Sequence, residues 1–233
     1  IGVRPGVFTA NCDEIDIHII GRGGHAARPH EASDPIAAAA QLINSLYLFI
    51  PRAPDSQESV VITIGQVTGG HTANVIPEEV VLRGTIRTLD RQVRAETFRH
   101  IERLAEGIGR TSDTRIHVEA GLSTQSVVND PELIDLMRMA TLEVAGPDSV
   151  QPIPRPSMGS EDFAHYMEYA SGAMIRLGCT SPEIGGSPLH APDFDVDEEA
   201  LRIGAKVLAR AAVYWSEPRR GARSESNPEV ANA

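Results

Sequence analysis

The order of hydrophobic patterns over residues 14–122 is the feature that most constrains the fold. Alternating apolar and polar residues, or runs of β-branched residues, mark four segments as strands, and two segments between them carry apolar residues at helical spacing. The strands are expected at 14–20, 59–67, 79–89 and 115–122, and the helices at 36–50 and 90–110. The resulting order, β-α-β-β-α-β, is that of the split βαβ, ferredoxin-like α+β sandwich.

Capping residues predict where both helices begin. Asp34 directly precedes Pro35, and a capping residue followed by proline is typical of a first helical turn. Asp90 stands in the same way before the second helix. Pro51 ends the first helix because proline cannot donate the next helical hydrogen bond.

The chain after residue 123 has a different pattern, with helices and very little sheet. Helices are expected at 131–145, 160–169 and 197–215, and one short strand at 173–177. Two or three helices with one or two short strands cannot close a layered domain, so we expect companion strands to lie elsewhere. The polar residues 217–233 are expected to form an unstructured tail.

Charge and composition exclude two classes of function. Of 233 residues, 32 are acidic and 21 are basic, and the net charge of −11 argues against a protein that binds the nucleic-acid backbone. No run approaches 18 apolar residues, and no secretory signal is visible. Cys12 and Cys179 make no disulfide framework, so a cytoplasmic protein with reduced thiols is expected. Because the first residue is Ile1, either an upstream part has been removed or the chain is a piece of a longer protein.

Three residues of the first part stand where a side chain can meet a ligand. His25 lies in a glycine-rich loop at the exit of a strand, Asn74 lies in the connection between two strands, and Arg87 is near a strand end. An arginine in that position is suited to clamp a carboxylate through two N–H groups. From the residues alone, a solvated turn or sheet face remains the alternative for each.

His190 is the strongest single candidate for a metal ligand. Prolines on both sides stiffen its backbone, and Asp193 and Asp195 offer second partners for its ring. Glu161 and Asp162 are candidates for a catalytic role. The alternative for them is an acidic pair that the dipole of a following helix stabilises.

Five segments, taken together, carry a resemblance to a known family. They are GRGGHAARPHEASDPIAAA, GGHTANVIPEEVVLRGTIRT, MGSEDFA, LGC and LHAPDFDVDEEAL. The chain resembles the zinc-dependent amidohydrolases of the aminoacylase and carboxypeptidase type over about residues 2–215. The closest branch contains N-acyl-amino-acid amidohydrolases, hippurate hydrolases and auxin-conjugate hydrolases.

The resemblance implies a domain organisation. Residues 12–123 would be a lid, or dimerisation, domain inserted into an α/β catalytic domain that holds two metal ions. Residues 1–11 would end the N-terminal catalytic segment, and residues 124–216 would form the C-terminal part of the catalytic domain. A homodimer through the lid and a small N-acyl amino acid as substrate are expected, with no nucleic-acid or membrane partner.

The resemblance also implies roles for single residues. His25 would stabilise the oxyanion in the active site of the partner subunit, Asn74 would contact substrate there, and Arg87 would hold the free carboxylate of the substrate. His190 would be the last metal ligand, and Glu161 with Asp162 would lie in a motif typical of the branch. The cofactor would be a divalent metal, zinc first, with manganese or cobalt as alternatives.

The other metal ligands of the family are missing from this sequence. The family carries a Cys-x-His motif, a pair of glutamates and a further histidine upstream of its lid, whereas Cys12 has no histidine two residues on. One histidine cannot hold two ions, so the chain alone is expected to be inactive. Two alternatives are a non-catalytic dimerisation protein derived from such an enzyme and a small-molecule sensor domain.

Overall fold

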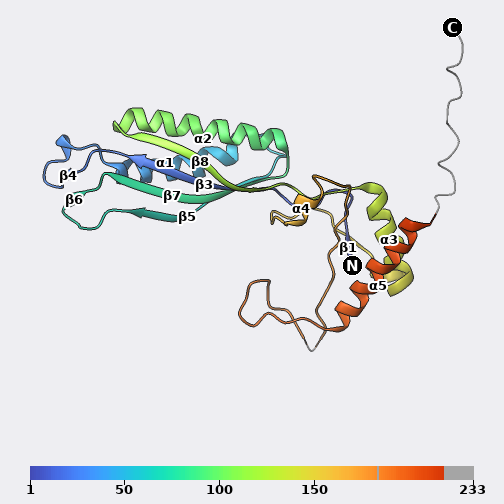
Figure 1. The fold of residues 1–233 in the computed structure, drawn as a ribbon. Coiled ribbons are helices and arrows are strands. Elements are labelled where there is room, and N and C mark those ends of the chain that lie inside the picture. The colour runs from blue at the N-terminus through green and yellow to red at the C-terminus, as the bar shows by residue number, and fades with distance from the viewer. Residues whose placement is uncertain (183, 218–233) are drawn as a thin grey trace, which may run out of the picture. The chain divides into compact units, whose positions relative to one another are not determined.

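The computed structural model describes residues 1–182 and 184–217, which form two compact units (Figure 1). The larger, the sheet unit, comprises Arg4–Pro131 and Ile153–Met174. The smaller, the helix unit, comprises Ile1–Val3, Glu132–Pro152 and the described residues from Ile175 onward. The segment 153–174 thus belongs with the sheet unit, and the assignment of the chain to a lid and a catalytic domain stays a prediction.

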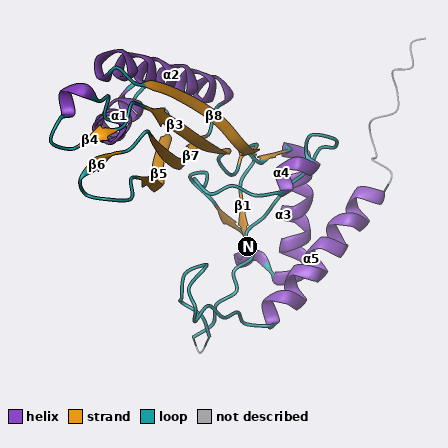
Figure 2. Ribbon diagram, turned by 60° about the vertical axis from the view of Figure 1, so that its left-hand side comes forward, coloured by secondary structure: helices purple, strands orange, loops and turns teal. Residues whose placement is uncertain are grey.

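The sheet unit is built on four antiparallel strands with two helices on one face (Figure 2). The strand order is β5-β7-β3-β8, and all neighbours are antiparallel. These elements are β3 (Cys12–Ile20), α1 (Pro35–Phe49), β5 (Val60–Gly69), β7 (Glu79–Thr88), α2 (Arg91–Ser112) and β8 (Arg115–Thr124). The predicted order of strands and helices is therefore confirmed.

The core lies between the helices and the sheet face that alternation predicts to be inward. Ile15, Ile17 and Ile19 of β3 are completely buried beneath Leu42 of α1 and Ile101 of α2. Burial of such side chains contributes about 1.5–3 kcal/mol each relative to exposure. The alternation in β3 thus fixes both its register and which of its faces the helices cover.

Both predicted helix caps are confirmed. The Asp34 carboxylate accepts hydrogen bonds from the backbone N–H groups of Ile36 and Ala37 at the start of α1. Asp90 accepts from Gln92 and Val93 in the same way at the start of α2. These bonds satisfy N–H groups that have no partner within the helix.

Short elements complete the sheet unit at its two ends. At one end β4 (Gly24–His25) pairs with β6 (Val75–Ile76), next to the 3-10 turn η1 (Pro29–Glu31). At the other end β2 (Gly6–Val7) pairs with β9 (Val128–Asn129). The remaining elements are η2 (Ile50–Arg52) and the single helical turn α4 (Phe163–Tyr166).

The helix unit contains two helices and a minimal sheet. α3 (Pro131–Ala145) begins at the junction with the sheet unit. α5 (Glu199–Ser216) contacts α3 where the Glu143 carboxylate accepts hydrogen bonds from Arg210 and Tyr214. β1 (Gly2–Val3) pairs in parallel with β10 (Gln151–Pro152), and η3 (Pro147–Ser149) precedes β10. None of the described helices is long and apolar enough to cross a membrane.

Two element predictions need correction, and one lies outside the described residues. The strand expected at 173–177 is only a single bridge between Arg176 and Gly2. In the described chain, this segment has no neighbouring strand with which it could form a longer pairing. The helix expected at 160–169 is the one turn α4. The tail expected at 217–233 falls, except for its first residue, outside the described residues.

Candidate functional site

The structure brings His25 and Asn74 together at one end of the sheet unit. His25 of β4 lies opposite Val75 of β6, and the backbone N–H of Ala26 donates to the carbonyl oxygen of Asn74 at 3.1 Å. Gly23 permits this approach, because a Cβ there would lie only 2.9 Å from the carbonyl oxygen of Ile76. The glycine-rich loop and the connection before β7 therefore form one exposed site.

The hydrogen bond to the imidazole of His25 decides which ring nitrogen can act on a ligand. The backbone N–H of Ala27 donates to Nδ1 at 3.1 Å, so Nδ1 is an acceptor in the neutral ring. The proton of the neutral ring is then on Nε2. Because the side chain is exposed, Nε2–H is available as a donor to an oxygen of a ligand.

Arg87 occupies the opposite end of β7, next to the loop 157–162. Its Nη1 donates to the carbonyl oxygen of Met158 at 3.1 Å, and the side chain is half-buried. The backbone N–H of Ala10 holds this loop in place by donating to the carbonyl oxygens of Ser157 and Gly159. Within the described chain Arg87 forms no ion pair.

Glu161 and Asp162 follow directly in the same loop, and both side chains are exposed. Asp162 is the first residue before α4, yet its carboxylate makes no capping hydrogen bond. The backbone carbonyls of both residues instead accept the N–H groups of Ala164 and His165. The Asp162 carboxylate therefore has no capping role at α4, and the function of both residues stays a prediction.

The site formed by His25 and Asn74 and the site formed by Arg87 and the loop 157–162 lie at opposite ends of β7. Asn74 precedes this strand and Arg87 nearly ends it, while β7 spans ten residues, or about 30 Å at 3.3 Å per residue (Figure 1). His25 and Arg87 of one chain are therefore too far apart to contact the same small molecule. Sequence spacing could not show this, because it depends on how the loop of β4 pairs with β6.

His190 lies in the helix unit and is exposed, with a left-handed backbone φ of 70°. Its predicted second partners are engaged elsewhere: Asp193 accepts a hydrogen bond from Ser187 Oγ at 2.7 Å, and Asp195 accepts from the backbone N–H of Val196 at 2.8 Å. Over residues 1–182 and 184–217, no group of three or more His, Cys, Asp or Glu side chains is arranged to hold a metal ion. The described residues therefore do not fit a metal centre by themselves.

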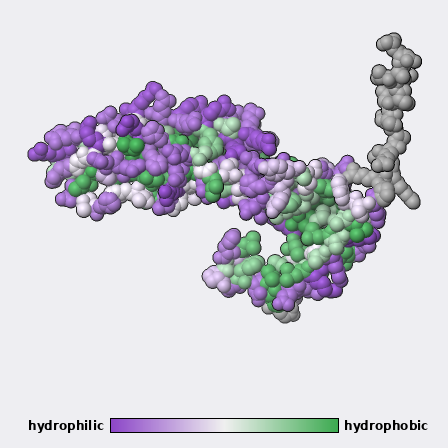
Figure 3. Space-filling view, viewed as in Figure 1, coloured by the Kyte–Doolittle hydropathy of each residue, from purple (hydrophilic) through white to green (hydrophobic). Residues whose placement is uncertain are grey.

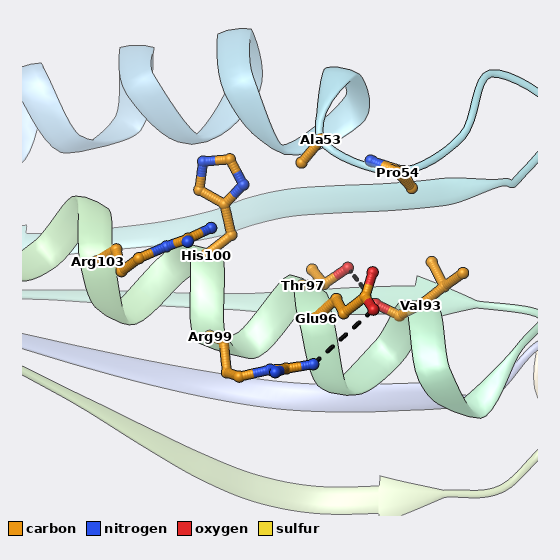
Figure 4. Close-up of a pocket in the computed structure, with 8 residues that line it drawn as sticks. All are labelled: Ala53, Pro54, Val93, Glu96, Thr97, Arg99, His100 and Arg103. Carbon is orange, nitrogen blue, oxygen red and sulfur yellow. Dashed lines mark hydrogen bonds and ion pairs between the residues drawn. The ribbon is translucent and has the colours of Figure 1, made fainter.

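One cavity of the sheet unit lies away from all the predicted residues. It has a volume of about 350 Å³ and lies between the chain after η2 and one face of α2 (Figure 4). Its lining includes Pro54, Thr97, His100 and Arg103. Burial, and to a smaller extent the charge of Arg103, lowers the pKa of His100 below its ordinary value of 6.5.

Known proteins resemble this chain along most of its length. It is 40% identical over 217 residues to a probable hydrolase of Synechocystis, covering 92% of this chain and 55% of that protein. It is 34% identical over 213 residues to an N-acetyl-L-cysteine deacetylase of Bacillus subtilis, covering 91% of this chain and 49% of that enzyme. The chain thus spans about half the length of these curated relatives.

A solved structure agrees in fold. A Bacillus subtilis protein described as a dinuclear metal-binding peptidase of the M20 family superimposes with a TM-score of 0.71 at 31% identity, covering 92% of this chain and 52% of that one. The resemblance drawn from the five sequence segments is therefore confirmed. The sequence profile of peptidase family M20/M25/M40 matches residues 17–214, and the chain belongs to that family.

Proposed function

We propose that this chain is the C-terminal portion of a metal-dependent amidohydrolase that cleaves the amide bond of N-acyl amino acids. Membership of peptidase family M20/M25/M40 supports a hydrolase acting on C–N bonds. The B. subtilis relative is named as an N-acetyl-L-cysteine deacetylase, and its substrate is an N-acyl amino acid with a free carboxylate. In this proposal residues 12–123 form a ferredoxin-like lid.

The observation that carries the proposal is the environment of Arg87. Among the described residues, the half-buried Arg87 guanidinium bonds to one carbonyl oxygen and to no carboxylate, so its charge is poorly compensated. A carboxylate would accept two parallel hydrogen bonds from it, the strongest pairing this side chain makes. Arg87 would therefore hold the free carboxylate of the substrate and so orient the amide bond.

His25 and Asn74 would act on the same class of substrate from another subunit. With its proton on Nε2, His25 would donate a hydrogen bond to the oxyanion that forms at the amide carbon, the kind of donor that commonly contributes 10²–10³-fold to rate. The length of β7, about 30 Å, keeps this pair away from Arg87 of its own chain. We therefore propose a homodimer in which each lid supplies His25 and Asn74 to the site of its partner.

Metal ions belong to the proposed whole enzyme rather than to this chain alone. The described residues do not fit a dinuclear centre, and we derive no catalytic step through one. Zinc is the ion we propose, with manganese or cobalt as alternatives, held by His190 together with ligands outside this chain. The present chain by itself is expected to bind substrate without hydrolysing it.

Ligand binding by the full chain tests the role of Arg87. We expect N-acetyl-L-methionine at millimolar concentration to shift backbone NMR signals of Arg87 and of residues 157–162, and the corresponding carboxamide to shift none of them. Arg87→Gln should abolish the effect. Arg83→Gln is the matched control, since Arg83 lies on the same face of β7 but already pairs with Asp16 at 3.1 Å. Equal shifts with acid and carboxamide would falsify the proposal.

A non-catalytic dimerisation protein is the second candidate, and the absence of a metal-ligand set from the described residues favours it. The two candidates differ in their response to ligand. A dimer that shows no carboxylate-dependent shift at Arg87 would favour the non-catalytic protein, whereas the shift supports the enzyme.

A further inference from the structure

The cleft between the chain after η2 and helix α2 has one apolar side. Its volume of about 350 Å³ is at the lower end of the range of small-molecule sites. Ala53 and Pro54 lie across from α2, as Figure 4 shows, and Val93 and Thr97 line the cleft from α2, where both are nearly completely buried. Thr97 Oγ1 already donates to the carbonyl oxygen of Val93 at 2.7 Å. These four residues therefore offer a ligand apolar contact rather than side-chain donors.

The other side of the cleft is polar and is formed entirely by α2, a helix whose surface is mainly hydrophilic (Figure 3). Its residues are Glu96, Arg99, His100 and Arg103. Arg99 and Arg103 are one turn apart on the same face of the helix, where two like charges are destabilising. Figure 4 shows His100 and Arg103 next to each other at one end of the cleft.

The carboxylates of α2 compensate the arginines on either side of Arg103 but not Arg103 itself. Glu96 Oε1 lies 3.9 Å from Arg99 Nη2, and Glu106, one turn beyond Arg103, pairs with Arg110. In the described part of the chain, Arg103 forms no ion pair and no side-chain hydrogen bond. One positive charge of the cleft is therefore left without a counter-charge.

His100 provides a neutral hydrogen-bond donor beside this charge. Burial, and to a smaller extent the charge of Arg103, lowers the pKa of the imidazole below 6.5, so the ring is mainly neutral at pH 7.5. A neutral imidazole keeps one N–H group. Among the described residues this ring has no hydrogen-bond partner, so its N–H group is available to an anion that Arg103 attracts.

We propose that this cleft is a binding site for a small monocarboxylate with a short apolar group. Arg103 binds the carboxylate through two N–H groups, and His100 donates a further hydrogen bond to it. The apolar group of the ligand contacts Ala53 and Pro54. Such a ligand brings the single negative charge that the cleft lacks. The site is separate from the residues of the candidate functional site, so the inference does not depend on the proposed function.

Backbone NMR of the full chain tests the proposal, at low ionic strength because salt screens an exposed charge. We expect 3-methylbutanoate at millimolar concentration to shift the signals of residues 53–54 and 93–103. The amide 3-methylbutanamide, which has the same apolar group and no charge, should shift none of them. Inorganic phosphate, an anion without an apolar group, should bind about tenfold more weakly. Bound 3-methylbutanoate should also raise the pKa of His100, because an adjacent anion stabilises the imidazolium.

A matched pair of variants separates the charge of Arg103 from the general charge of the helix. Arg103→Gln should weaken the binding of 3-methylbutanoate about tenfold, because it removes the charged donor. Arg110→Gln removes an equal charge from the same helix outside the cleft and should leave binding unchanged. Both side chains are exposed, so circular dichroism should give both variants the thermal midpoint of the unmodified chain.

Three outcomes overturn the proposal. The first is that 3-methylbutanoate causes no shifts in the cleft, or shifts only Arg87 and residues 157–162. The second is that the amide or phosphate binds as tightly as 3-methylbutanoate. The third is that Arg103→Gln and Arg110→Gln weaken binding equally. Because the cleft binds a carboxylate whether or not Arg87 does, this proposal and the proposed function can fail separately.

Discussion

Asp13 shows, at the scale of one residue, where hydrophobic patterns stop being informative. It occupies an inward position of β3, in line with Ile15 and Ile17, but its carboxylate is only 2% exposed and accepts hydrogen bonds from Arg94 and from Asn11. A polar residue at the start of an apolar alternation is normally taken as the edge of the strand. The partner that makes it a core residue, Arg94, lies on α2 and far away in sequence, where no local pattern identifies it.

The Asp13–Arg94 pair predicts a large loss of stability on mutation. Asp13→Asn leaves the guanidinium of Arg94 three-quarters buried without its counter-charge, and we expect the free energy of unfolding to fall by about 3 kcal/mol. The control is Asp16→Asn on the same strand, where an exposed pair with Arg83 should contribute less than about 1 kcal/mol. Urea unfolding of both variants measures the difference, and equal losses would contradict the prediction.

The candidate site residues were identifiable from the sequence, whereas their arrangement was not. His25 and Asn74 stand in glycine-rich or turn-rich segments that carry a strong family pattern. Their contact depends on the two-residue pairing of β4 with β6, which is too short to leave a periodic signal. The acceptor for Arg87, the carbonyl oxygen of Met158, is a backbone atom and has no sequence signature.

At the scale of elements, the parts of the fold that the sequence predicts well are those with local causes. Asp34 and Asp90 cap their helices through bonds to residues two and three positions on, and alternation sets the faces of β3 and β7. The strand predicted at 173–177 was wrong because its formation depends on a partner far away in the sequence. Its apolar residues satisfy the pattern, but a strand also requires a neighbour, and the described chain provides only the bridge to Gly2.

The lowered pKa of His100 on α2 predicts that the free energy of unfolding depends on pH. Its pKa is lowered in the folded state, first by burial and then by Arg103, so below pH 6.5 the unfolded chain binds a proton that the folded protein takes up only at lower pH. The free energy of unfolding should therefore fall as the pH drops through 6.5 toward the lower pKa of the folded protein. His100→Gln should remove this part of the slope, and Arg103→Gln should remove less of it. Urea unfolding at a series of pH values checks this, and an unchanged slope in His100→Gln would refute it.

Exposed apolar side chains where α1 ends beside β5 indicate where the proposed dimer contact lies. The exposed Tyr47, Leu48 and Phe49 end α1 next to β5, an edge strand of the sheet, and the Tyr47 hydroxyl accepts the backbone N–H of Ile64 there. Sedimentation at tens of micromolar should show a dimer, and Leu48→Asp should convert it to a monomer. Leu122→Asp, at the exposed Leu122 of the other edge strand β8, should not. A monomer before any mutation, or dissociation by Leu122→Asp alone, would place the contact elsewhere.

At the scale of the whole molecule, we predict how much zinc the chain retains. A stable zinc centre needs about three or four protein ligands, and no such group exists among residues 1–182 and 184–217, where the aspartates near His190 bond to other partners. After incubation with zinc and dialysis, we therefore expect less than one ion per chain by elemental analysis, with no change in His190→Ala. Two retained ions per chain would show that the chain carries a complete site.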